Sequence, residues 1–305
     1  MSAPGHHLPA AYLPADGRPV RVSIGTRPMD LHDWIEIDHL RVVELDHKDE
    51  LLRERHDEVV ATMPRGDDGS QEVLELLVEH LLARFPDVYA RDGHSRAAIV
   101  DRQRDVTVAL DSGHPIDVAG RLVQEDLCLM SHVDGAWILT AASLCFPSRW
   151  RLSDKIGRDL RAIHGPVPFY EERIGAPVDT AFDRLRPETP VWRINWTILD
   201  DPELFQPDSA TRREPHELVG DFGTALHVRV ERQTLRALPR SGDVLFTIRT
   251  YTCPLGHVES MRAGALAQFA DTLEATAQPT TDYKGWAGWR DAVVAWARSE
   301  RSPSG

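Results

Sequence analysis

The sequence predicts an α+β fold, an antiparallel sheet with helices packed around it. The predicted strands are short runs rich in β-branched residues, and two of them are joined by Asp134-Gly135, a dipeptide typical of a tight hairpin. Helical periodicity is strong on either side of these strands. The regular alternation of strands and helices that a doubly wound sheet requires is missing.

The chain has 305 residues, and its first segment differs in composition from the rest. Residues 1–30 are rich in Pro, Gly and His and are predicted to form an extended N-terminal arm. Residues 31–300 are then expected to form one domain with helices at its N- and C-terminal ends. In the clearest helix, Ser70 suits the N-cap position and Pro86 ends the helix, while leucines and valines recur on one face.

Periodicity and turn residues place the remaining elements. His164 is expected at the end of a helix, where Gly165 would adopt a left-handed capping conformation and Pro166 would stop the helix. The predicted helices cover residues 46–63, 70–85, 118–126, 153–163, 258–275 and 289–299. The predicted strands cover residues 97–101, 106–110, 127–133, 136–142, 191–198, 225–230 and 244–251.

The composition excludes several classes of function. The formal net charge of −13 disfavours nucleic acid and anionic lipid as partners, and a cationic substrate or a basic redox partner fits the sign better. The three cysteines, Cys128, Cys145 and Cys253, include no Cys-x-x-Cys pair, so neither a disulfide framework nor a structural zinc site is expected. There is no signal-peptide pattern and no apolar run of about 20 residues, so we expect a cytoplasmic protein without a membrane partner.

Four segments mix bulky aromatic, proline and polar residues in a way that a plain core does not need: residues 124–127, 145–168, 193–196, and 230–235 with 246–251. At these residues the sequence resembles the family of haem-dependent oxidative N-demethylase α subunits, over the span from Asp33 to Leu255. Residues 137–168 are the most specific part of the resemblance. The phrase Arg-Val-Glu-Arg-Gln-Thr-Leu-Arg at residues 229–236 is the next.

The resemblance implies a Per-Arnt-Sim-like antiparallel sheet whose surrounding helices enclose haem b. It also implies a monooxygenase-type enzyme that uses O2 to demethylate a small amine, either a dimethylamine-like substrate or a larger biosynthetic amine. Electrons would come from NADPH through separate flavin and iron–sulfur reductase subunits. The chain itself has no Gly-x-Gly-x-x-Gly and no phosphate loop, so we do not expect it to bind its own nicotinamide in a Rossmann fold.

His164 is expected to be the metal ligand. A histidine at a helix C-terminus can simply favour the negative end of the helix dipole. Haem, however, needs an axial donor, and neutral imidazole is the usual one. The resemblance places His164 in the Ile-His-x-Pro-Val-Pro phrase of the family. Cys145 is the competing thiolate ligand, although a lone buried cysteine usually acts as a small hydrophobe.

Catalytic roles are expected for Glu125 and Tyr251. Glu125 precedes an apolar strand and can be read as a solvated helix end, or as a carboxylate that holds an alkylammonium ion. The resemblance favours the second interpretation. Tyr251 ends a predicted strand and is expected to direct its hydroxyl into the same pocket, although most tyrosines at strand ends are structural.

The remaining cofactor contacts are expected from basic and aromatic residues. Arg232 and Arg249 lie on predicted strands in apolar company and are candidates for the haem propionates. Weaker candidates for the same rim are Lys155, Arg149 and Trp150. Trp196 and Phe246 are expected either to wall the haem pocket or to serve as core aromatics.

Two other functions stay open. A haem-binding gas sensor or carrier of the Per-Arnt-Sim type would use the same fold, but nothing after Tyr251 resembles an output module. A non-haem iron oxygenase would use His132 and Asp134, which have the spacing of a facial triad, with His227 or His257 as third ligand. Asp134 already has a role in the predicted hairpin turn, which weakens the second alternative.

Overall fold

The computed structural model describes residues 7–20, 24–93, 97–165, 167–168, 170, 175–208 and 221–300. Its centre is a seven-stranded sheet of order β1-β8-β9-β10-β6-β7-β2, in which every neighbouring pair is antiparallel. A separate three-stranded sheet has the order β3-β4-β5. The strands are β1 (Arg27–Pro28), β2 (Val60–Thr62), β3 (Tyr89–Arg91), β4 (Ala98–Asp101), β5 (Val106–Ala109), β6 (Asp126–Val133), β7 (Ala136–Ser143), β8 (Val191–Leu199), β9 (His227–Ala237) and β10 (Val244–Pro254).

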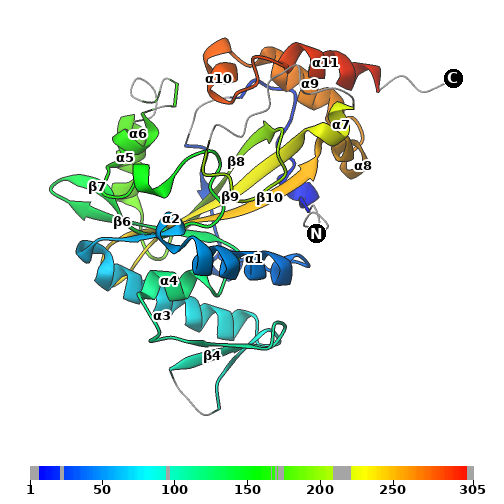
Figure 1. Cartoon of the computed structure of the whole chain (residues 1–305). Helices are drawn as coiled ribbons and strands as arrows, with labels where there is room; N and C mark the ends of the chain where they lie inside the picture. The colour runs from blue at the N-terminus through cyan, green and yellow to red at the C-terminus, as the bar shows by residue number, and fades with distance from the viewer. Residues whose placement is uncertain are drawn as a thin grey trace.

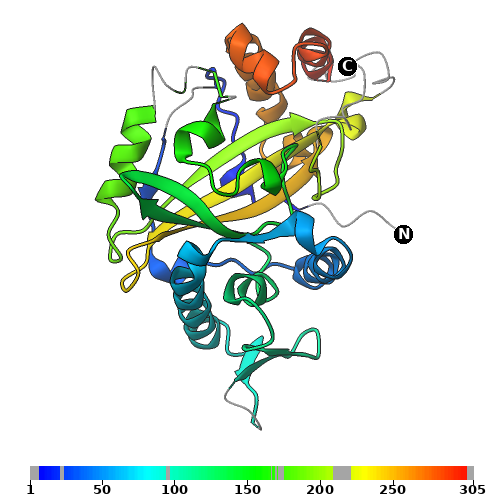
Figure 2. The same ribbon diagram turned by 60° about the vertical axis from the view of Figure 1, so that its left-hand side comes forward.

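Helices pack on both sides of the large sheet, so the predicted α+β class and antiparallel sheet are confirmed. In Figures 1 and 2, α1, α3 and α4 lie on one side of the sheet and α5 and α6 on the other, while α9, α10 and α11 gather at one end of the long strands. The helices are α1 (Arg41–Glu54), α2 (His56–Val59), α3 (Asp67–Arg84), α4 (Pro115–Gly120), α5 (Leu160–His164), α6 (Gly175–Arg184), α7 (Phe222–Ala225), α8 (Val258–Met261), α9 (Ala265–Ala275), α10 (Gln278–Tyr283) and α11 (Arg290–Ser299). None of the described helices has both the length and the apolar character needed to cross a bilayer.

The β6–β7 hairpin forms as its dipeptide predicts. Val133 pairs with Ala136, so the turn has two residues. Asp134 and Gly135 both have positive φ, 49° and 84°, which is the backbone of a type I′ turn.

The large sheet has two faces because side chains alternate along each strand. The face that meets α5 and α6 carries an apolar cluster and is called the α5 face: Cys128, Met130, Leu235, Phe246 and Ile248 pack with Leu160, Ile163 and Phe182. The opposite face is called the α3 face. At one end it packs on the α3 and α4 side through Leu127, Leu129 and Leu245 with Val73, Leu77 and Leu81. At the other end it packs against α9 and α11 through Val228, Val230, Tyr251 and Cys253 with Phe269, Leu273 and Val293.

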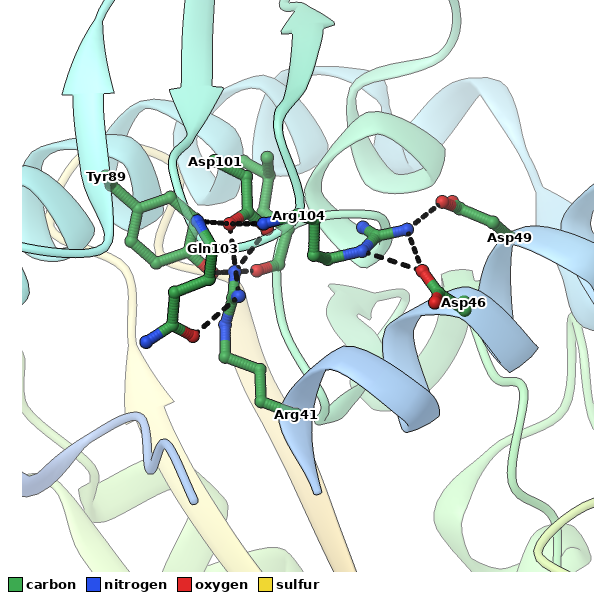
Figure 3. Close-up of polar contacts among 8 residues, drawn as sticks. Arg41, Asp46, Asp49, Tyr89, Asp101, Gln103 and Arg104 are labelled. Atoms are coloured by element: carbon green, nitrogen blue, oxygen red, sulfur yellow. Dashed lines mark hydrogen bonds and ion pairs between the residues drawn. The ribbon is translucent and has the colours of Figure 1, made fainter. Parts of the chain in front are cut away.

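A buried ion pair attaches the small sheet to α1. Arg41 at the start of α1 donates to the Asp101 carboxylate at 3.1 Å and to the Tyr89 hydroxyl at 2.6 Å (Figure 3). Arg104 adds a second link, with its Nε 3.0 Å from the Asp46 carboxylate. These contacts satisfy the buried guanidinium of Arg41, which is 1 % exposed, and so fix the small sheet against the helical layer.

The predicted N-terminal arm is not simply extended. Among its described residues, Ala10–Tyr12 form a 3-10 turn and Arg27–Pro28 pair with β8 as strand β1. Leu13 and Ala15 are buried in the cluster beneath α9. Residues 1–6 and 21–23 of the arm lie outside the described residues.

Two predicted helices have wrong C-terminal boundaries, because a strand forms where each was expected to end. The helix predicted for residues 46–63 begins earlier, at Arg41, and its last residues form β2, since the β-branched pair Val59-Val60 leads into pairing with β7. The helix predicted for residues 118–126 ends at Gly120. Lys48 donates to the carbonyls of Val123 and Glu125 at 2.8 and 2.7 Å, which supplies these carbonyls with a partner outside any helix.

Three predicted caps and boundaries are also corrected. α3 begins at Asp67, so Ser70 lies inside the helix and not at its N-cap. Gly165 has φ −48° and ψ −35°, a right-handed conformation, and Pro166 lies outside the described residues. The helix predicted for residues 258–275 is interrupted at Gly264, whose φ of 80° breaks the hydrogen-bond ladder between α8 and α9.

Candidate functional site

The α5 helix begins late because the chain before it pairs with β7. The Leu139 amide donates to the Arg158 carbonyl at 3.0 Å, and the Gly157 amide donates to the Leu139 carbonyl at 2.8 Å. The helix predicted for residues 153–163 is therefore reduced to Leu160–His164. Asp159, rather than Ser153, caps it, because its carboxylate accepts from the Ala162 amide at 2.7 Å.

His164, at the last position of α5, has a defined tautomer. Its Nδ1 lies 2.8 Å from the Leu160 carbonyl oxygen, which can only accept, so Nδ1 carries the proton. Burial lowers the pKa of His164, and the ring is therefore neutral near pH 7. The ring stacks on Tyr170 with centroids 4.9 Å apart and planes 7° from parallel. The result is an oriented imidazole whose Nε2 lone pair is available to a metal.

Two basic side chains, Lys155 and Arg193, lie close enough to His164 to lower its pKa further. The Lys155 ammonium sits 4.2 Å from the ring centroid of Trp150. The Arg193 Nε is buried and has no hydrogen-bond partner. Burial lowers the pKa of both groups, and within the described part of the chain neither forms an ion pair. Two cations without a carboxylate partner match the two propionates of haem.

Some side chains on the α5 face of the central strands are more exposed than their neighbours on the α3 face. On the central strands, the α3-face residues Arg232, Thr234 and Thr247 are buried, whereas Gln233 and Phe246 on the α5 face are only half-buried. Strands β6, β8, β9 and β10 together carry both apolar and polar side chains on this face. An apolar surface of Cys128, Leu235, Phe246 and Ile248 borders a polar one of Arg193, Asn195, Glu231 and Gln233. Haem has the same division between its macrocycle and its propionates, so the residues present fit this cofactor.

Glu125 and Tyr251 lie together, but on the α3 face. Glu125 is fully buried; its Oε1 accepts from the Glu36 amide at 3.0 Å and its Oε2 has no hydrogen-bond partner. Burial raises the pKa of this carboxyl, while the Arg249 charge opposes the rise. The Tyr251 hydroxyl donates to one carboxylate oxygen of Glu36 and the Tyr12 hydroxyl donates to the other. The structure thus brings Glu125 and Tyr251 together around Glu36 and separates both from His164 by the sheet.

Arg232 and Arg249 belong to the same α3-face network. Arg232 donates to the Trp34 carbonyl at 3.2 Å, and its Nε lies 3.4 Å from the Glu36 carboxylate. Arg249 is fully buried and pairs with Asp38 at 2.6 Å and Glu44 at 2.7 Å. Both guanidinium groups therefore already have carboxylate partners within this chain, and the structure does not bring them to His164.

The expected rim and wall residues divide in the same way. Trp150, Lys155 and Phe246 all lie on the α5 face near His164. Trp196 lies on the α3 face, where its ring packs 5.4 Å from Phe269 and 5.5 Å from Trp286. Arg149 forms an ion pair with Asp200.

The competing metal ligands have other roles in the fold. Cys145 is buried beside Phe146 and Leu204, and burial raises the pKa of its thiol to about 12, which keeps it protonated. Asp134 occupies the hairpin turn, and the ring of His132 lies 5.2 Å from that of Trp137. No three His, Cys, Asp or Glu side chains of the described ranges gather as a metal site, so a His132–Asp134 facial triad has no support.

Sequence reasoning missed two charged residues that face the α5 side, Arg193 and Glu231. Both lie in segments that mix bulky aromatic and polar residues, residues 193–196 and 230–235. The signal that could have found them is the alternation of β8 and β9: once His164 is assigned to one face, the odd-numbered residues of both strands share that face.

The chain is similar to a known protein family over most of its length. The model described as haem-dependent oxidative N-demethylase, alpha subunit-like, matches residues 25–294. The matched span contains α5 with His164, strands β6 to β10, and both faces of the sheet.

Proposed function

Because this chain belongs to the haem-dependent oxidative N-demethylase, alpha subunit-like family, we propose that it binds haem b on the α5 face and uses O2 to remove a methyl group from a small secondary amine. Dimethylamine is the simplest substrate of this class. The bound haem would supply the activation of oxygen, and the side chains of the α5 face would supply its ligand, its charge balance and the binding of the amine.

One observation carries the assignment of the site, the geometry of His164. A neutral imidazole whose Nδ1 proton is held by a backbone carbonyl presents Nε2 in a fixed direction, which is what an axial ligand requires. Lys155 and Arg193 beside it would neutralise the propionates. Phe246 and Ile248 would pack on the macrocycle, and this contact would keep water away from the site.

The strand order supports a Per-Arnt-Sim-like description. The strands β6 to β10 run in spatial order β8-β9-β10-β6-β7, so the first hairpin of the five lies beside the last strand. The long connection between β7 and β8 carries α5 and α6, which cover one face of the sheet. A cofactor between α5 and this face would be enclosed by the sheet on one side and by His164 on the other.

Electrons would come from elsewhere. The family description names an alpha subunit, which implies a complex of several subunits. We propose that separate flavin and iron–sulfur subunits deliver electrons from NADPH, in the cytoplasm. The acidic net charge of −13 suits a partner with a basic docking surface.

The ligand assignment is tested by replacing His164. We expect purified wild-type protein to show a Soret absorption band and His164→Ala to lose haem or retain it only weakly, because the axial donor is removed. His132→Ala is the matched control, since His132 lies on the exposed end of β6 and is the key residue of the rival non-haem site.

Haem occupancy is measured by the pyridine haemochrome assay and iron content by elemental analysis. Equal haem occupancy in His164→Ala and wild type would contradict the ligand assignment. Iron without a Soret band, lost in His132→Ala, would favour the non-haem alternative.

A further inference from the structure

We propose that Glu231, on the α5 face of β9, binds the protonated nitrogen of the amine substrate. The inference rests on the proposed function and assigns a residue that the sequence did not single out. It is an alternative to the role expected for Glu125, whose carboxyl group lies across the sheet from His164.

The position of Glu231 follows from the register of β8 and β9. Glu231 pairs with Asn195, and Gln233 pairs with Arg193. Residues two apart on a strand lie on the same face, so all four side chains emerge beside one another on the α5 face. Arg193, one of the two basic residues proposed to hold the propionates, is therefore a diagonal cross-strand neighbour of Glu231 on this face.

The Glu231 carboxylate is held in place by one of its oxygens. Oε2 accepts from Asn195 Nδ2 at 3.1 Å and from Gln233 Nε2 at 2.9 Å. Oε1 accepts no hydrogen bond from a described residue, and the side chain is half-buried. Two amides therefore orient the carboxylate and leave one oxygen free, which is the arrangement that a ligand N–H needs.

Among the described residues, the basic side chains around Glu231 do not donate a hydrogen bond to its Oε1. The Arg229 guanidinium donates to main-chain carbonyls, such as that of Phe146 at 2.7 Å, and Lys284 donates to the Trp196 carbonyl at 2.6 Å. Lys155 and Arg193 are the other basic groups whose pKa Glu231 affects. Once two propionates pair with Lys155 and Arg193, Oε1 of Glu231 still has no N–H donor from the described residues. A dialkylammonium ion would supply that donor at the edge of an apolar site.

The other acidic residue in strands β6 to β10 is unsuited to this role. Asp126 also lies on the α5 face, but its two oxygens accept from the Cys145 and Phe146 amides at 2.7 and 3.0 Å. Burial raises its pKa to about 6. Asp126 thus serves to fix the chain after β7, and Glu231 is the acidic residue of these strands with an oxygen to offer.

The experiment is a calorimetric titration of the haem-loaded protein with dimethylammonium chloride, with haem content measured in parallel. Glu231→Gln suits the question because the new amide oxygen can keep both hydrogen bonds of Oε2, while an NH2 group replaces the free oxygen. We expect normal haem content and a dissociation constant about 10- to 100-fold weaker, the range for a lost charge-assisted hydrogen bond. Glu231→Asp keeps the charge but withdraws the carboxylate by one methylene, and we expect an intermediate loss.

The control is Glu75→Gln, which removes the same charge from the exposed surface of α3 and should bind dimethylammonium as wild type does. Wild-type affinity in both Glu231 variants, with haem bound, would overturn this inference and leave the haem proposal intact. A loss of binding in Glu125→Gln but not in Glu231→Gln would also overturn it. If the wild type itself takes up no haem, the proposed function fails and this inference fails with it.

Discussion

Two arginines on opposite faces of the sheet, the fully buried Arg249 and the half-buried Arg193, differ in their partners. Arg249 on the α3 face is held between Asp38 and Glu44, whereas the Nε of Arg193 on the α5 face has no partner. A buried cation with two carboxylates completes a network within the chain. A buried cation without one costs stability unless a ligand supplies the missing charge.

Replacement of these arginines should have opposite consequences. Arg249→Met leaves two carboxylates uncompensated and should lower the free energy of unfolding by about 3–5 kcal/mol. Arg193→Met removes an unpartnered charge and should change the stability of the haem-free protein by less than about 1 kcal/mol, while haem binding weakens. Urea unfolding of the haem-free proteins and haem titration measure the two effects. Strong destabilisation by Arg193→Met with unchanged haem affinity would contradict this assignment.

At this scale the predicted position of His164 at a helix end is confirmed, while its role as metal ligand stays a prediction. The predicted propionate contacts Arg232 and Arg249 lie on the opposite face of the sheet, where each meets a carboxylate of this chain. In the sequence, Arg232 and Arg249 lie on predicted strands among apolar residues, as an arginine that binds a propionate would. Their carboxylate partners, Glu36, Asp38 and Glu44, come from a segment about 200 residues away in the sequence, and no local pattern indicates such pairing. The catalytic roles of Glu125 and Tyr251 stay predictions.

Among the elements, α5 carries the proposed haem ligand and has only five residues. It has a single turn, and its start depends on the Asp159 cap and on the pairing of residues 157–159 with β7. Isolated helices of this length do not form in water, so the direction of His164 depends on these contacts.

Removal of the cap should therefore affect haem more than overall stability. Asp159→Ala should lower the free energy of unfolding by about 1 kcal/mol and increase the rate of haem loss, because α5 frays and His164 loses its orientation. Asp221→Ala is the matched control, since Asp221 caps the similarly short α7 by accepting from the Gly223 amide at 2.8 Å. Transfer of haem to apomyoglobin measures the rate. Equal rates for the two variants would show that the cap does not position His164.

Several strands were predicted closely, but the strand predicted for residues 225–230 lies at His227–Ala237, and β1, β2 and β3 were not predicted. Residues 98–101, 106–109, 126–133 and 136–143 form strands within a residue or two of the prediction, because β-branched runs and the Asp-Gly turn act locally. The helix predicted for residues 153–163 was largely wrong because hydrogen bonds to β7 outweigh the helical propensity of that segment. The periodicity of a single segment does not predict whether that segment will pair with a distant strand.

On the scale of the whole molecule, the chain is proposed as the catalytic part of a larger electron-transfer assembly. The protein has charge −13, and its sequence contains no nucleotide-binding glycine motif. Haem on the α5 face would therefore depend on a partner for its electrons.

The isolated chain should not turn over with NADPH. We expect no formaldehyde from dimethylamine and NADPH alone, and formaldehyde release once a flavin and iron–sulfur reductase or a chemical reductant is added. Formaldehyde is measured colorimetrically, with His164→Ala as the control for haem-independent chemistry. Turnover by the lone chain with NADPH would contradict the proposed need for a partner. Haem reduction and O2 binding without any demethylation would favour the gas sensor or carrier.

The placement of different chemistry on the two faces of β9 has a consequence for how the gene can change. A single inserted or deleted codon within His227–Ala237 would shift every later side chain to the opposite face. If the change precedes Glu231, Arg232 would face α5 and Glu231 would face the packed network around Glu36. Point substitutions on either face are compatible with the other, but length changes in this strand are not. We therefore expect insertions and deletions among relatives of this chain to fall in the connections and to spare β9.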